Sequence, residues 1–205
     1  MSGGPVFLAP LRLEASAIRR GAPAATIERV GMGPARAAAA CARLGTSIPA
    51  GRPVVLAGVA GGLVPGLCAG ELVVASAIVG GDPEGAQLPL AAAPSMAAHL
   101  EAAGIPARLA PVYSSATILH GRAARVAAAS SGAPVVEMEA RWLSPLGASR
   151  PFAVLRVVLD TLEDELVSFA SPRATVRALR VLRAAAAALA SWAPADLSDP
   201  LTRSN

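Results

Sequence analysis

The stretch that decides the fold runs from Ala133 to Asp164 and reads APVVEMEARWLSPLGASRPFAVLRVVLDTLED. It contains two apolar runs typical of buried strands, Pro134–Met138 and Pro151–Leu159. Carboxylates stand at the end of both runs. An open α/β sheet places its chemistry at the carboxyl ends of its strands, so we expect these acids near one rim of a sheet. The acids are Glu137, Glu139 and Asp160.

A short helical piece, Ala140–Leu143, separates the two runs, and Pro145 ends it because proline has no N–H to donate inside a helix. The unit predicts a strand, a crossover and a second, adjacent strand. A single acid at a strand end is as compatible with a helix cap or a solvated side chain as with a site. Three acids at two strand ends favour a site, since acids are depleted in strands and buried charges need partners.

The chain has 205 residues, which suits one domain with a sizeable core. We assign residues 1–194 to this domain and residues 195–205 to a disordered polar tail. Hydrophobic residues make up 54% of the chain, but alanine dominates them. The longest apolar segment, Pro53–Gly81, is interrupted by Pro65 and Glu71, so no run reaches the roughly 18 residues that a membrane-spanning helix needs.

The N-terminus and the cysteines favour a cytoplasmic location. No charged residue precedes the first apolar run, which argues against a secretory signal. Cys41 and Cys68 stand in apolar sequence and are predicted to be buried free thiols in a reducing compartment. Two cysteines and two histidines without metal spacing predict no metal site. The hydrolase motif G-x-S-x-G is absent as well.

All 18 basic residues are arginine, and the chain contains no lysine. This excludes a lysine Schiff base and a P-loop lysine. The net charge of +4 is compatible with a nucleic-acid partner, but the arginines are scattered and only six aromatic residues (Phe 3, Trp 2, Tyr 1) could stack on bases. The arginines that align at helical spacing predict a solvated helix face, and we expect no nucleic-acid partner. They are Arg173, Arg177, Arg180 and Arg183.

Strand-like and helix-like segments alternate along the rest of the chain, which indicates an α/β protein. The further strands are predicted at Pro5–Ala9, Ala24–Val30, Val54–Val59, Glu71–Val79 and Ala107–Tyr113. The further helices are predicted at Leu11–Arg20, Ala35–Leu44, Pro94–Gly104, His120–Ser131 and Pro172–Ala193, with Gly45 ending the second of them.

Two glycine-containing turns have two interpretations. They either let the backbone approach a ligand closely or simply connect neighbouring elements. Gly31-x-Gly33 resembles half of a dinucleotide fingerprint, but Arg36 stands at the third glycine and no acid follows about 20 residues later, which argues against NAD. Its N–H groups could still face an anion or a ribose. Gly61 and Gly62 follow a buried strand and permit close approach of a ligand.

Three motifs in this order resemble the nucleoside phosphorylase and nucleosidase superfamily, to which purine nucleoside phosphorylase and methylthioadenosine/S-adenosylhomocysteine nucleosidase belong. They are GMGPARA (Gly31–Ala37), LAGVAGGLVPGLCAGELVVAS (Leu56–Ser76), and VVEMEA (Val135–Ala140) followed by FAVLRVVLD (Phe152–Asp160). The segments GMGPARA and RVVLDT are most similar to the hopanoid-associated phosphorylase group. The resemblance implies a three-layer α/β fold of the phosphorylase type, with a central mixed twisted sheet flanked by helices, and a homo-oligomer that uses no cofactor.

The resemblance also implies roles for individual residues. Asp160 matches the acid that protonates or hydrogen-bonds N7 of the purine, and apolar neighbours would favour its protonated form. Glu139 matches the acid that binds the ribose hydroxyls, with Met138 packing on the sugar. Glu14 matches the carboxylate that orients the attacking water. Further substrate contacts are implied for Glu137, Val59, Ala60, Gly61, Ile118 and Leu119, and Gly33 and Arg36 are candidates for binding phosphate as a co-substrate.

The chain departs from the family pattern at two site positions. Leu159 replaces a serine before the aspartate, and Val59 replaces a serine or threonine in the glycine loop, so both positions lose a hydroxyl. The more apolar walls suit a bulky apolar 5′ group, which favours release of adenine from an adenosylhopane-like nucleoside by water or phosphate. Two alternatives remain: a methylthioadenosine, S-adenosylhomocysteine or futalosine nucleosidase, and a degenerate nucleoside-binding protein without turnover.

Overall fold

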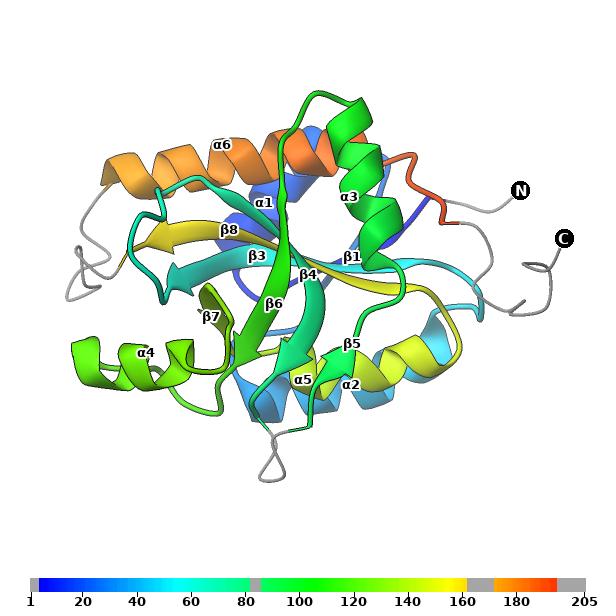
Figure 1. Cartoon of the computed structure of the whole chain (residues 1–205). Coiled ribbons are helices and arrows are strands. Elements are labelled where there is room, and N and C mark those ends of the chain that lie inside the picture. Colours follow the sequence, from blue (N-terminus) through cyan, green and yellow to red (C-terminus); the bar gives the residue numbers. More distant parts are fainter. Residues whose placement is uncertain (1–3, 82–85, 162–171, 195–205) are drawn as a thin grey trace, which may run out of the picture.

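A computed structural model describes residues 4–81, 86–161 and 172–194, and the elements within these ranges form one mixed sheet with helices around it (Figure 1). The strands are β1 (Val6–Ala9), β2 (Thr26–Arg29), β3 (Val54–Gly62), β4 (Leu72–Val79), β5 (Leu88–Pro89), β6 (Arg108–Ser114), β7 (Val135–Glu137) and β8 (Phe152–Asp160). The helices are α1 (Arg12–Gly21), α2 (Pro34–Ser47), α3 (Ala93–Ala102), α4 (Gly121–Ala129), α5 (Ala140–Leu143) and α6 (Pro172–Leu189), with a 3₁₀ turn at Ser144–Ala148 after α5.

The strand pairings close a ring. The strand order is β2-β1-β3-β7-β6-β4-β5, and β8 pairs with both β3 and β4. Successive hydrogen-bonded pairs therefore connect β3 to β8, β8 to β4, β4 to β6, β6 to β7 and β7 back to β3. The pairs β1–β2, β1–β3, β3–β8, β4–β6 and β6–β7 are parallel, whereas β3–β7, β4–β5 and β4–β8 are antiparallel. The predicted α/β fold with a mixed sheet flanked by helices is confirmed.

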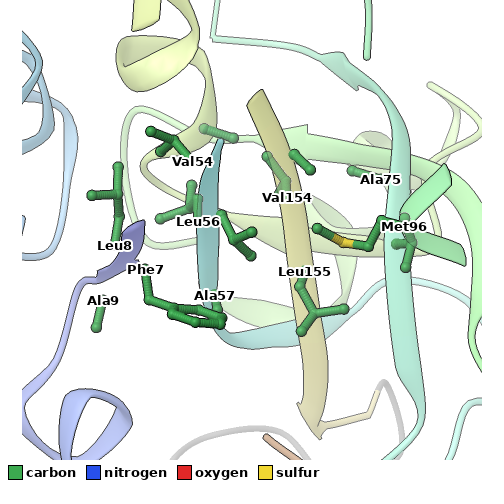
Figure 2. Close-up of a cluster of buried hydrophobic side chains, with 14 of the residues drawn as sticks. Phe7, Leu8, Ala9, Val54, Leu56, Ala57, Ala75, Met96, Val154 and Leu155 are labelled. Atoms are coloured by element: carbon green, nitrogen blue, oxygen red, sulfur yellow. The ribbon is translucent and has the colours of Figure 1, made fainter. Parts of the chain in front are cut away.

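Helices cover both faces of the sheet (Figure 1). On one face α1 packs against α6, and α3 contacts α6 beside them; on the other face α2 packs against α5. Because both faces are covered, β1, β3 and β8 are apolar almost throughout, as buried parallel strands are. Their side chains interlock in the core, where Phe7, Leu56 and Leu155 are fully buried and Met96 of α3 closes the cluster (Figure 2).

Most predicted elements are confirmed within a few residues, and the differences involve glycine. Helix α2 runs through Gly45 to Ser47, because the buried Leu44 anchors this turn and nothing lies within 4 Å of where a Cβ at Gly45 would sit. Strand β3 continues through Gly61 and Gly62, which were expected in a loop, because both pair with β7. The predicted burial of both cysteines is wrong, since the free thiol of Cys68 is exposed and Cys41 is only half-buried.

Several predictions concern residues that the structure does not describe. The disordered tail, residues 195–205, and most of the acidic loop after Asp160 lie outside the described ranges. The boundary of the single domain stays a prediction. Within the described residues, no helix combines the length and the apolar character needed to cross a membrane.

Candidate active site

The ends of β7 and β8 meet on either side of Gly61. Strand β3 pairs Gly61 with Val136 of β7 and with Asp160 of β8, after a register shift between Ala60 and Gly61. A Cβ at Gly61 would lie 3.1 Å from Asp160 Oδ1 and 3.2 Å from Val136 Cγ1, so glycine permits this close approach. The two acid-bearing strands were predicted to be adjacent, and this is wrong because β3 lies between them. Their acids nevertheless converge.

A cavity of about 320 Å³ opens at this point, and its walls are mainly apolar. It is lined by every predicted site residue except Gly33 and Arg36. The lining residues are Pro10, Leu11, Glu14, Met32, Val59, Ala60, Gly61, Thr117, Ile118, Leu119, His120, Arg125, Val136, Glu137, Met138, Glu139, Leu159 and Asp160. The roles proposed for them from the resemblance stay predictions, but the structure places them in one cavity.

Arg156, in the middle of β8, is fully buried and holds two of the acids. Its Nη2 donates to Glu137 Oε2 and, at 3.0 Å, to Glu139 Oε2. Burial alone would lower the pKa of Arg156, but the charges of Glu137, Glu139 and Glu14 raise it, so the guanidinium remains charged. Sequence reasoning missed this residue, although a charge inside the apolar run FAVLRVVL was a signal that a buried partner exists.

Glu137 is occupied by protein donors on both oxygens. Oε2 accepts the N–H groups of Glu139 and Ala140 at 3.0 and 2.8 Å, which caps the start of α5, and it also accepts from Arg156. Oε1 accepts the hydroxyl of Ser114 from the end of β6. Glu137 thus ties β6, β7, β8 and α5 together at the cavity wall.

Glu139 is 4% exposed and faces the same guanidinium. Burial raises its pKa to about 7 and the charge of Glu137 adds to the shift, although the Arg156 charge and the Gly33 N–H oppose it. That N–H donates to Glu139 Oε1 at 3.0 Å, and Gly33 reaches this position at a φ of +90°, which favours glycine. The glycine turn therefore positions Glu139. The Arg36 side chain is exposed and folds back over Gly31, outside the cavity.

Glu14 is 2% exposed in the first turn of α1. It accepts the N–H of Leu11 at 2.6 Å and the N–H of Val59 at 2.8 Å. Burial raises its pKa, against the lowering effects of the Val59 N–H, the Arg156 charge and the Leu11 N–H. Gly58 makes room for this arrangement, because a Cβ there would lie 2.5 Å from Glu14 Oε1 and 2.7 Å from Arg156 Nη1.

Asp160 meets a positive charge that the sequence did not predict. Arg125 of α4 is 6% exposed, and its Nη2 donates to Asp160 Oδ2 at 2.5 Å. Its Nη1 donates to the carbonyl oxygens of Gly62 and Thr161, both at 3.3 Å. Apolar surroundings were expected for Asp160. The available signal was helical periodicity, which places Arg125 on the same buried side of α4 as Ala128.

The site thus combines four carboxylates with two buried guanidinium groups. Burial raises the pKa of Glu14 and Glu139, so the acids outnumber the cations only as these two groups ionise. In that state the cavity favours a cation and a cationic transition state. Among the described residues, no group of three or more His, Cys, Asp or Glu side chains is arranged to hold a metal ion. His120 and Thr117 also line the cavity and were not predicted as site residues.

Solved structures share this fold. A Helicobacter pylori 5′-methylthioadenosine/S-adenosylhomocysteine nucleosidase with 5′-methylthioadenosine in its active site is 17% identical, with a TM-score of 0.74 over 92% of this chain and 96% of that chain. A futalosine hydrolase of the same organism is 14% identical, with a TM-score of 0.77 over 91% and 98%. A Streptococcus pyogenes S-adenosylhomocysteine nucleosidase in complex with 5-methylthiotubericidin is 16% identical, with a TM-score of 0.72 over 91% and 98%.

Identities this low establish the fold, which is the mixed α/β fold of the phosphorylase type. A search of curated protein sequences found no match. The family comparison is more extensive, since the model of the phosphorylase superfamily matches residues 14–187, which begin at Glu14 and include the cavity acids and the two arginines that pair with them. From this match over most of its length, the chain belongs to the phosphorylase superfamily.

Proposed function

We propose that the chain hydrolyses the N-glycosidic bond of a purine nucleoside that carries an apolar group at its 5′ position. The observation that carries the proposal is the convergence of Glu14, Glu139 and Asp160 in one apolar-walled cavity. Nucleoside N-glycosidic bond cleavage is the chemistry of this superfamily. Hydrolysis, the purine and the 5′ group are inferred here.

The reaction needs a base for water, a binder for the sugar and a group for the leaving base. Glu14, buried and with a raised pKa, takes one proton from water while the water oxygen forms a bond to C1′. The C1′–N9 bond breaks, and its electron pair moves onto the purine next to Asp160, which supplies or directs the proton that the base gains. Glu139 accepts hydrogen bonds from the ribose hydroxyls, and the excess of carboxylates stabilises the cationic sugar.

Water is favoured over phosphate as the nucleophile by the glycine turn. The Gly33 N–H, a candidate phosphate donor, is already bonded to Glu139, and Arg36 is exposed outside the cavity. A phosphate in the cavity would face Glu14 and Glu139 and their negative charges. Phosphorolysis therefore has less support than hydrolysis.

The cavity edge supports an apolar 5′ group. Met32 and Ile118 line the cavity although they are 42% and 54% exposed, and Val59 and Leu159 bring apolar side chains where the family has hydroxyls. Such a wall favours apolar contact over hydrogen bonding to a polar substituent. An adenosylhopane-like nucleoside meets this requirement, and a methylthioadenosine, S-adenosylhomocysteine or futalosine nucleosidase is the alternative suggested by the solved structures.

Release of the base, followed by chromatography, tests the proposal. The substrates are adenosine, methylthioadenosine, S-adenosylhomocysteine and a long-chain 5′-alkyl adenosine, each with and without phosphate. We expect phosphate-independent release that is fastest with the alkyl substrate and is lost in Asp160→Asn. Glu28→Gln, which alters an exposed ion pair with Arg43, serves as the control.

Two results would contradict the proposal in different ways. Release that requires phosphate would establish phosphorolysis. Nucleoside binding without release from any substrate would indicate a binding protein, the second candidate, which the missing hydroxyls at Val59 and Leu159 favour.

A further inference from the structure

Two neighbouring helices, α1 and α6, carry a row of exposed arginines. The helices pack against each other on one face of the sheet, so the sides that they turn away from the sheet form one surface (Figure 1). We call this surface the basic face. Its arginines are Arg12, Arg19 and Arg20 of α1 and Arg173, Arg177, Arg180 and Arg183 of α6, all of them exposed.

The packing of the two helices holds these charges close together. Arg173, Arg177 and Arg180 follow one another at the spacing of a single helix side. Gly21 lets the end of α1 approach α6, because a Cβ there would lie 2.1 Å from the carbonyl oxygen of Arg183. The last turn of α1, with two of the arginines, therefore lies beside the turn of α6 that carries Arg183.

Acids do little to neutralise the basic face. The only acid within α1 and α6 is Glu14, which is buried in the cavity wall, and α3 beside them carries Glu101 alone. Among the described residues, no ion pair joins a carboxylate to any arginine of this face. A second copy of the face would add like charges, so the face favours an anionic partner.

Two exposed aliphatic side chains stand among the arginines and narrow the choice of partner. Leu13 is 61% exposed beside Arg12, and Val176 is 48% exposed between Arg173 and Arg177. Phosphates of a nucleic acid would bind the arginines but leave these aliphatic groups without a partner. A bilayer takes both, because aliphatic groups enter the boundary between headgroups and acyl chains while guanidinium groups stay at the anionic headgroups.

We propose that the basic face docks on the surface of a bilayer that contains anionic lipids. The end of α1 that carries Arg12 and Leu13 also contributes Leu11 and Glu14 to the cavity wall. Docking therefore brings the cavity close to the bilayer, where a nucleoside with a long apolar 5′ group concentrates. The inference goes beyond the proposed function and stands without it, since no arginine of the basic face lines the cavity.

Sedimentation with vesicles tests the proposal on the full chain in the absence of any nucleoside. One set of vesicles consists of phosphatidylcholine alone, and the other of phosphatidylcholine and phosphatidylglycerol in equal parts. We expect the unmodified chain to bind only the anionic vesicles at low ionic strength. Binding should weaken as salt is added, because salt screens exposed charges.

Two double variants with the same loss of charge locate the contact. Arg173→Gln/Arg180→Gln changes α6, and Arg36→Gln/Arg43→Gln is the matched control, with exposed arginines at the same spacing on α2 across the sheet. An arginine near an anionic surface strengthens binding by about fivefold, so the α6 variant should bind about 20-fold more weakly. The α2 variant should bind much as the unmodified chain does.

Leu13→Gln separates a bilayer from other polyanions, since it removes an apolar contact and no charge. We expect it to weaken binding to anionic vesicles by about tenfold and to leave binding to duplex DNA unchanged.

Three results would overturn the proposal. The first is equal binding to both kinds of vesicle, or binding to neither. The second is an α6 double variant that binds anionic vesicles as well as the α2 control does. The third is tighter binding to duplex DNA than to anionic vesicles with no effect of Leu13→Gln on either, which would make the face a nucleic-acid surface. Base release in solution tests the proposed function separately.

Discussion

Glu14 is the only cavity acid whose hydrogen bonds, among those of the described residues, come from backbone N–H groups alone, those of Leu11 and Val59. These donors fix the carboxylate, and burial raises its pKa, which makes it a stronger base. We expect Glu14→Gln to lower kcat by about 10²–10⁴-fold. Dissociation constants for the nucleoside should change little, because a glutamine at this position keeps the size of the side chain.

Single-turnover rates and equilibrium binding, measured on the same variant, check this expectation. Glu28→Gln controls for the loss of a carboxylate at a distant, exposed position. A variant that loses binding but converts bound substrate at the normal rate would show that Glu14 holds the nucleoside instead of activating water.

The acids of the site could be predicted at the level of single residues, and their partners could not. Glu139 and Asp160 end apolar runs, which is a local signal in the sequence. Arg125 stands 35 positions from Asp160 in the chain, and Arg156 stands 17 positions from Glu139. Which arginine faces which acid depends on how β7, β8 and α4 meet, and no local pattern carries that information.

Two glycines with opposite surroundings test the packing of β3 and α2. Gly58 faces the site, where a Cβ would lie 2.5 Å from Glu14 Oε1 and 2.7 Å from Arg156 Nη1. Gly45 lies inside α2 with nothing within 4 Å. We expect Gly58→Ala to lower the free energy of unfolding by about 1–3 kcal/mol through overpacking. Gly45→Ala should raise it by about 0.5–1 kcal/mol, since glycine disfavours a helix interior.

Urea denaturation of both variants measures these changes, and each variant controls for the other because both add one methyl group. A Gly58→Ala variant as stable as the unmodified chain would mean that the crowding at Gly58 is relieved by movement of the Glu14 side chain. Gly58→Ala should also slow base release, as it displaces Glu14 and Arg156 together.

Gly45 and the pair Gly61 and Gly62 explain why the ends of α2 and β3 were predicted wrongly. A glycine after an amphipathic segment commonly ends a helix, yet α2 continues through Gly45 because Leu44 is buried and the Ile48 N–H closes the last turn on the Leu44 carbonyl. A Gly-Gly pair after a buried strand is typical of a turn, yet β3 continues because partners flank Gly61 on both sides. Burial of Leu44 decided the first case and strand pairing the second, and propensity alone anticipates neither.

At the scale of the whole molecule, the ring of strands brings the site together. β8 is parallel to β3 and antiparallel to β4, and the return through β6 and β7 places Val136 and Asp160 on opposite sides of Gly61. Apolar runs predicted the strands, but a run does not specify its neighbours or its direction. The prediction that β7 and β8 are adjacent is therefore wrong, whereas the mixed sheet implied by the resemblance to a family is confirmed.

Because of the buried acids, we expect stability to fall and activity to rise as pH increases. Burial raises the pKa of Glu139 from 4.5 to about 7, so between these values the folded chain holds a proton that the unfolded chain has released. The contribution of Glu139 to stability is therefore complete below about pH 4.5 and is lost as pH rises through about 7. Activity should change in the opposite direction, because Glu139 and Glu14 must be ionised to accept protons or hydrogen bonds.

Glu139→Gln separates this effect from the titration of other groups. Calorimetric melting temperatures of the unmodified chain and the variant, measured from about pH 5 to 8, should differ in slope. The unmodified chain should lose several degrees relative to the variant across this range, because a shift of this size corresponds to about 3 kcal/mol and a domain of this length changes by about 2–4 °C per kcal/mol. Parallel curves would show that Arg156 keeps Glu139 ionised throughout, which would contradict the raised pKa of Glu139.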